Sequence, residues 1–198
     1  MPELPEVEVV RRSLQSFING LKIKKVTIFN RNLRYKIKRN FEKIIEHQKI
    51  IFIKRRSKFL LLGLENNFTI LIHLGMTGKI FISKENFKKI LKTSFYFESE
   101  MNKKHNHFII QFNKKVKLIY NDVRKFGFIK LYNFTDITRI SHLKSLGPEP
   151  LEKKWNFKYF INYIVNKKRN IKNILMDQKF VAGLGNIYAN EILFLSGV

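Results

Sequence analysis

The fold is decided by the central stretch of the chain, residues 58–83, which reads KFLLLGLENNFTILIHLGMTGKIFIS. Three apolar runs, 58–63, 68–74 and 79–83, are separated by short polar or glycine-containing segments. Runs of this length between turn residues are typical of strands, and strands joined by tight turns pair antiparallel. The stretch therefore predicts consecutive antiparallel strands.

The same pattern continues on both sides of this stretch. The further strand-like runs are 22–29, 49–54, 107–112, 115–121 and 127–132. About eight such strands indicate an antiparallel sandwich or barrel. The long polar segments from Asn30 to Gln48 and from Lys84 to Asn106 are predicted to be loops or short helices.

Helical patterns flank the strands. Between Pro5 and Ile18 the apolar residues recur at helical spacing, and Gly20 follows, which predicts one amphipathic helix. After Thr135 the helical period returns and ends at the cluster Gly147-Pro148-Glu149-Pro150. Further helices are predicted over 156–166, 170–178 and 187–195, with a glycine-containing turn before the last one.

These patterns predict an α+β chain in three parts. They are an antiparallel β-sandwich with flanking helices (1–134), a linker helix with the Gly/Pro boundary (135–151) and a partial helical domain (152–198). A fragment of about 45 residues rarely buries a core alone, so we expect the last part to lean on the first.

Composition limits the function classes. The chain has 198 residues, a formal charge of +24, 44% hydrophobic residues and 19 Phe, which together exclude a disordered basic tail. It has no Cys, which excludes disulfides, a thiolate nucleophile and Cys-ligated zinc or iron–sulfur sites. No apolar run reaches the roughly 18 residues of a membrane span, so we expect a soluble intracellular protein.

The positive charge favours a nucleic-acid partner. Codon drift in an AT-rich genome is the alternative, since Ile, Lys, Asn and Phe dominate the sequence and much of the charge could lie on a solvated surface.

The N-terminus could supply a nucleophile. Removal of Met1 would expose the secondary amine of Pro2, which can form a charged iminium with a carbonyl-like carbon, and Glu3 beside it could act as acid or base. The alternative is that Pro2 and Glu3 only start a helix.

Three further segments could bind nucleic acid. Met76 between two glycines could wedge between bases, or it could be a core residue of an ordinary hairpin. Arg124 and Phe126 could read and stack on a base, or form a solvated turn with a core Phe. The basic run 166–172 with the turn 183–186 could bind phosphate at a helix N-terminus, or be a solvated helix face.

Taken together, these segments resemble the formamidopyrimidine-DNA glycosylase family of base-excision repair enzymes, which is related to endonuclease VIII. The motifs that carry the resemblance are Met1 to Glu8, Arg55 to Leu61, 73–79, 122–127, Leu146 to Leu151, and Leu175 to Glu191. Six collinear motifs are more specific than any one of them, and Leu4 favours the formamidopyrimidine branch.

The resemblance implies a β-sandwich followed by a helix-two-turn-helix domain, with DNA in the cleft between them. It implies that Pro2 attacks C1′ of a flipped damaged nucleotide, that Glu3 protonates the sugar ring oxygen, and that Lys58 assists β-elimination. The base would be 8-oxoguanine or a ring-opened purine, and the partner double-stranded DNA with a damaged purine or abasic site. Glu6 matches an acidic position near the nucleophile.

The resemblance also implies DNA-binding roles. Met76, Arg124 and Phe126 would fill the gap left by the flipped base, with Arg124 reading the opposite cytosine. His105, Lys168 and Asn186 match the family's phosphate-contacting positions, and Lys172 matches one more weakly. Without the resemblance, the sequence around His105 and His107 gives little indication of a function.

Two departures stand out. First, the family's four-cysteine zinc finger and base-covering loop have no counterpart, so the chain matches a C-terminally truncated member and we expect no cofactor. Second, Lys125 stands where a second Arg is common. We expect a monomeric bacterial cytoplasmic protein near the nucleoid, acting as a DNA glycosylase and abasic-site lyase. The alternatives are a non-enzymatic DNA-binding remnant of the family and a basic RNA-binding protein.

Overall fold

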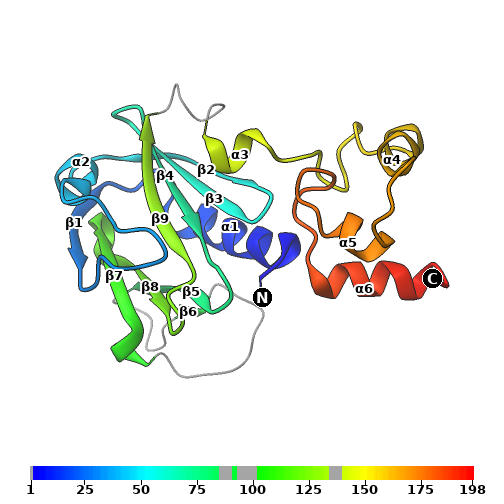
Figure 1. Cartoon of the computed structure of the whole chain (residues 1–198). Helices are drawn as coiled ribbons and strands as arrows, with labels where there is room; N and C mark the ends of the chain where they lie inside the picture. The colour runs from blue at the N-terminus through cyan, green and yellow to red at the C-terminus, as the bar shows by residue number, and fades with distance from the viewer. Residues whose placement is uncertain (1, 85–90, 93–101, 134–139) are drawn as a thin grey trace. The chain divides into compact units, whose positions relative to one another are not determined.

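The computed structural model describes residues 2–84, 91–92, 102–133 and 140–198. The chain divides into two compact units, residues 1–137 and 138–198, which we call the β unit and the helical unit (Figure 1).

The β unit contains two antiparallel sheets, as the sequence predicts. One sheet has the order β1-β7-β8-β5-β6 and the other the order β2-β3-β4-β9. Their strands are β1 (Ile23–Ile28), β2 (Ile50–Arg56), β3 (Phe59–Leu64), β4 (Phe68–His73), β5 (Gly78–Lys84), β6 (Leu91–Lys92), β7 (Asn106–Phe112), β8 (Val116–Asp122) and β9 (Phe128–Asn133). All eight strand-like runs of the sequence are strands. The segment 84–106 is predicted to be loop or short helix, but it contains the two-residue strand β6. Most of this segment lies outside the described residues.

Helix α1 (Leu4–Ile18) packs its apolar face into the core of the β unit. Val7, Val10, Leu14 and Ile18 are almost completely buried and belong to one cluster with the apolar side chains of the strands. Burial of a Val, Leu or Ile side chain contributes about 1.5–3 kcal/mol, so this face fixes the helix on the sandwich. The start of α1 is thereby held next to strands β2 and β3.

Short helices complete the β unit. Helix α2 (Phe41–Ile45) lies within the segment predicted as loop or short helix, and its Phe41 and Ile45 are buried. Two 3₁₀ turns, η1 (Lys103–His105) and η2 (Asn113–Lys115), flank β7.

The helical unit contains α3 (Ser141–Lys144), α4 (Phe157–Ile164), α5 (Ile171–Leu175) and α6 (Asn186–Leu195). The linker helix predicted after Thr135 begins only at Ser141, because the backbone of Ile140 is not helical; residues 134–139 lie outside the described part. Phe180, which is fully buried, is the centre of the core, and the ring of Tyr163 stacks on it at 4.2 Å between centroids.

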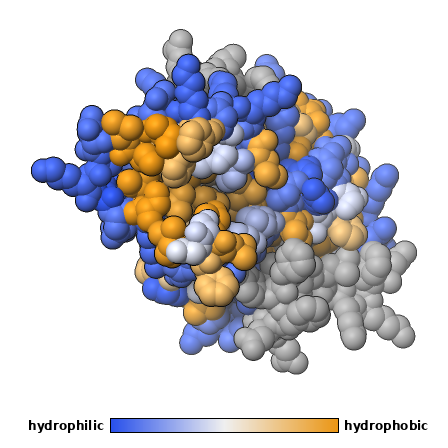
Figure 2. Space-filling view, turned by 90° about the vertical axis from the view of Figure 1, so that its right-hand side faces the viewer, coloured by the Kyte–Doolittle hydropathy of each residue, from blue (hydrophilic) through white to orange (hydrophobic). Residues whose placement is uncertain are grey.

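The helical unit also exposes large apolar side chains on its own surface, part of which appears in orange in Figure 2. The exposed residues are Leu151, Phe157, Val165, Met176, Ile187, Ile192, Phe194, Leu195 and Val198. Within the described residues, no helix is both long and apolar enough to cross a bilayer.

Candidate active site and nucleic-acid interface

The start of α1 brings the side chains of Glu3 and Glu6 together close to Pro2. Glu3 is the N-cap residue and is 1% exposed, and Pro2 and Glu6 are half-buried. The backbone N–H of Glu3 donates to Oε2 of Glu6 at 2.9 Å, which is half of a capping box. Glu3 therefore starts the helix, as the alternative interpretation expects, whereas Pro2 lies one residue before the N-cap. The capping role of Glu3 is compatible with a chemical role, because the same contact fixes two carboxylates close to Pro2.

Lys58 faces these carboxylates from the turn between β2 and β3. Its side chain is buried, at 8% exposure. Burial lowers the pKa of Lys58, while the negative charges of Glu3 and Glu6 act to raise it. Two sequence segments that are far apart, the N-terminus and the β2–β3 turn, thus place a buried ammonium group in the field of two carboxylates.

The turn that presents Lys58 is held by an ion-pair network. Ser57 is buried and has a positive φ of 53°, a conformation that is costly for a residue with a side chain. Arg55 donates from Nη1 to the Ser57 carbonyl at 2.9 Å and from Nε to Oε2 of Glu8 at 3.0 Å. Glu8 on α1 therefore anchors the turn through Arg55.

Glu8 is a strongly ionised member of this network. Burial acts to raise the pKa of Glu8, but hydrogen bonds from Arg11, Arg55 and Arg12 outweigh it and lower the pKa to about 2. The Arg11 and Arg55 bonds measure 2.9–3.1 Å.

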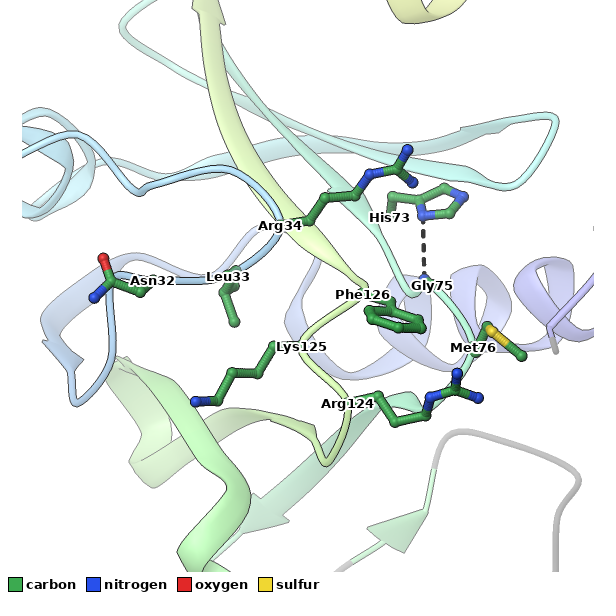
Figure 3. A pocket seen from close by; sticks show the side chains of 9 residues that line it. All are labelled: Asn32, Leu33, Arg34, His73, Gly75, Met76, Arg124, Lys125 and Phe126. Carbon is green, nitrogen blue, oxygen red and sulfur yellow. Dashed lines mark hydrogen bonds between the residues drawn. The ribbon is translucent and has the colours of Figure 1, made fainter.

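Two loop ends project from the sandwich near each other. We call residues 74–77, between β4 and β5, the Met76 tip, and residues 123–127, between β8 and β9, the Arg124 tip. Met76 is 43% exposed and Phe126 is 44% exposed, so the alternatives in which they are core residues are wrong. The guanidinium carbon of Arg124 lies 4.5 Å from the centre of the Phe126 ring, and Figure 3 shows both side chains beside Met76.

The tips border a concavity of about 650 Å³ (Figure 3). Its lining includes Arg34 and His73, to which sequence reasoning gave no role, and Lys125, which it noted only as standing in place of a second Arg. Nδ1 of His73 accepts the backbone N–H of Gly75 at 3.1 Å, so a neutral His73 ring carries its proton on Nε2. The only feature of the sequence that pointed to His73 is its place at the end of a predicted strand, just before a glycine-containing turn. Arg34 lies in the segment 30–48, which has no periodic pattern.

A smaller cavity, of about 40 Å³, connects the Met76 tip with the N-terminus. Pro2, Glu6, Met76 and Thr77 are among its lining residues. The candidate nucleophile and the candidate wedge residue therefore border the same space within the β unit.

Two further histidines lie at the start of β7. His105 is half-buried at the end of η1 and is not among the residues that line the concavity, so its phosphate role stays a prediction. His107 is buried, and its Nε2 lies 2.6 Å from the backbone oxygen of Asp122.

The helical unit holds the remaining predicted positions. Lys168 is exposed in the α4–α5 connection, Lys172 is half-buried in α5, and Asn186 is the exposed first residue of α6. The turn before α6 is fixed by Gln178, which accepts the Gly183 N–H at 2.9 Å and donates to the Leu184 carbonyl at 2.7 Å. The structure thus presents the start of α6 and basic residues on one compact unit, as an anion site at a helix N-terminus requires.

The described residues contain no group of three or more His, Asp or Glu side chains that could hold a metal ion. The chain has no Cys anywhere, so a four-cysteine zinc finger is not part of these 198 residues.

Comparisons with known proteins bear on both units. The family model described as the formamidopyrimidine-DNA glycosylase N-terminal domain matches residues 1–129, and that of the H2TH domain of the same enzymes matches residues 146–198. A formamidopyrimidine-DNA glycosylase of Rickettsia bellii is 39% identical over 199 residues, covering 100% of this chain and 67% of the relative. One from Bartonella quintana is 41% identical over 200 residues, covering 99% and 67%.

Solved structures agree. The complex of Lactococcus lactis Fpg with DNA containing an abasic site has a TM-score of 0.84 and 32% identity, covering 99% of this chain and 68% of that one. The complex of the same enzyme with DNA containing N7-benzyl-Fapy-dG has a TM-score of 0.84 and 32% identity, covering 100% and 68%. The chain therefore spans about two thirds of the length of these relatives.

Proposed function

Because this chain belongs to the formamidopyrimidine-DNA glycosylase family, we propose that it is a DNA glycosylase and abasic-site lyase that removes oxidised purines through a Schiff base at Pro2. The observation that carries the proposal is the buried Lys58 beside Glu3 and Glu6 at the start of α1, next to Pro2. Burial of two ionisable groups, Glu3 and Lys58, beside the half-buried Glu6 is costly, and such clusters are typical of active sites.

The chemistry follows from these groups. After removal of Met1, the lone pair of the Pro2 nitrogen attacks C1′ of the damaged nucleotide, the bond from C1′ to the base breaks, and the departing base takes up a proton from water. The carboxylate of Glu3 takes the proton of the attacking nitrogen and passes it to the sugar ring oxygen, whose bond to C1′ opens to give the charged iminium.

Strand cleavage uses the iminium as an electron sink. The carboxylate of Glu3 takes a proton from C2′, the bond between C3′ and its phosphate oxygen breaks, and water then releases Pro2 from the sugar. Lys58, as a buried cation, stabilises the leaving phosphate.

The two tips serve the DNA side of the reaction. A base inside the duplex cannot be attacked at C1′, so it must leave the stack and the gap must be filled. Met76 and Phe126 are exposed apolar side chains suited to this gap, and Arg124 can hydrogen-bond the orphaned base. Lys168, Lys172, Asn186 and His105 would contact phosphates, with the +24 charge as the general attraction.

The relatives support this substrate class. The L. lactis enzyme has been crystallised with abasic-site DNA and with N7-benzyl-Fapy-dG DNA, and the relatives named above come from bacteria. We extend these properties to this chain: damaged duplex DNA as the partner, action as a monomer in the bacterial cytoplasm, and no cofactor within these residues.

Borohydride trapping on a duplex with one abasic site tests the proposal, because only an imine is reduced to a stable cross-link. We expect cross-linking of the wild type and of Pro5→Ala, a matched change in the first turn of α1. We expect none with Pro2→Gly or with an N-terminal tag that keeps the amine blocked. A wild-type chain that binds this duplex without cross-linking would overturn the enzymatic proposal in favour of a DNA-binding remnant.

A further inference from the structure

Asp122 is a buried carboxylate at the end of β8, between the two tips. It is 0% exposed, and within the described part of the chain no lysine or arginine forms an ion pair with it. A buried charge without a cation is tolerated only when hydrogen bonds satisfy it. The groups that donate hydrogen bonds to Asp122 therefore indicate its structural role.

Both tips and their base supply those donors. Oδ1 accepts the hydroxyl of Thr77 at 2.5 Å and the N–H of Arg124 at 3.3 Å, and Oδ2 accepts the N–H of Gly127 at 2.9 Å. The Tyr120 hydroxyl adds a longer bond to Oδ2 at 3.3 Å. Burial and the charge of Asp122 raise the pKa of Tyr120, so its hydroxyl stays protonated and remains a donor.

Thr77 is the direct link between the tips. Its hydroxyl donates to Asp122 and at the same time accepts the N–H of Arg124 at 3.1 Å. The backbones also touch, because a Cβ atom placed on Gly75, which has a φ of 64°, would lie 2.5 Å from the nitrogen of Gly127. The two tips are thus packed and hydrogen-bonded as one body.

We propose that Asp122 and Thr77 are positioning residues that lock the Met76 tip and the Arg124 tip together, so that both enter the DNA gap as a single rigid wedge. The inference rests on the proposed function for its DNA step, whereas the lock itself is a property of the free protein. Neither residue contacts the reacting atoms in this account, and their effect passes through Met76, Arg124 and Phe126.

Amide hydrogen exchange in the free protein tests the lock without DNA. Thr77→Val removes the cross-tip hydroxyl at nearly constant volume, and Thr77→Ser restores it. Thr69→Val is the control for loss of a threonine hydroxyl in the β unit: Thr69 is fully buried whereas Thr77 is half-buried, and among the described residues the Thr69 hydroxyl has no hydrogen-bond partner. We expect at least tenfold faster exchange of the Arg124 amide in Thr77→Val and wild-type exchange in Thr77→Ser and Thr69→Val. Unchanged exchange in Thr77→Val would overturn the lock.

A double-mutant cycle on DNA tests the single wedge. Affinity for a duplex with a tetrahydrofuran abasic analogue, which needs no catalysis, is measured for Met76→Ala, Arg124→Ala and the double variant. We expect the two losses to be coupled by threefold or more in the wild-type background and independent in Thr77→Val. Independent losses in the wild type would overturn the single wedge. A wild type with no preference for the abasic duplex would overturn the proposed function, while the exchange experiment would still decide the lock.

Discussion

Replacement of Glu8 by Gln tests the network that holds the Lys58 turn. The pKa of Glu8 is lowered from 4.5 to about 2, a difference that corresponds to roughly 3 kcal/mol of stability at neutral pH. The side chain is 24% exposed and Gln can still accept a hydrogen bond, so solvent screening and the remaining bond reduce the expected loss to about 2 kcal/mol.

The pH dependence has a definite sign. Because the pKa of Glu8 is lower in the folded protein than in the unfolded chain, its stabilisation is complete above pH 4.5 and is lost as the pH falls toward 2. Wild type and Glu8→Gln should therefore differ at pH 7 and converge near pH 2.

Urea unfolding followed by circular dichroism, at pH 7 and at pH 2.5, measures both effects. Glu65→Gln, which changes an exposed carboxylate in the β3–β4 turn, serves as the control and should match the wild type within about 0.5 kcal/mol. Equal stability of Glu8→Gln and wild type at pH 7 would refute the assignment of Glu8 as the anchor of the turn.

Three further predictions concern the tips and the buried lysine. Arg124→Ala should erase a preference for cytosine opposite the lesion in single-turnover excision; a preference that survives removes Arg124 from its assigned role. Burial lowers the pKa of Lys58, so the rate of β-elimination on abasic DNA should begin to fall at a pH below the usual lysine pKa of 10.5. Lys58→Arg should give a rate that is constant up to pH 10, because arginine keeps its charge. Identical pH profiles would argue against a charged Lys58. Gly127→Ala should destabilise the β unit by about 3 kcal/mol in thermal unfolding, because its Cβ would meet a backbone oxygen at 2.7 Å as well as the Tyr120 hydroxyl. Gly20→Ala has open space around it and should cost only about 1 kcal/mol, because its φ of 76° is unfavourable for a side chain. Equal losses would contradict the close packing of the tips.

The sheets could be predicted from sequence because their signal is local. The apolar runs around residues 58–83 are separated by turn residues, so the strands can be predicted from local sequence. The structure adds the strand register, the division into two sheets and pairings between strands that are far apart in the sequence, such as β1 with β7. The spacing of apolar residues predicts too long a linker helix, because it runs through Ile140, whose backbone is not helical.

The site was less accessible to sequence reasoning, since it depends on contacts between distant segments. Spacing alone favoured a helix start for Pro2 and Glu3, and only the family resemblance gave them a chemical role. Arg34 and His73 reach the concavity through tertiary packing. The hydrogen bonds that Asp122 accepts from Thr77 and Gly127 likewise leave no local pattern in the sequence.

The central claim is that the processed N-terminal amine is the nucleophile. Its most direct test is peptide mapping by mass spectrometry of the borohydride-reduced complex with abasic-site DNA, which locates the sugar on one residue. We predict the adduct on the nitrogen of Pro2, in the peptide that lacks Met1. An adduct on Lys58 or on any other lysine would contradict the account.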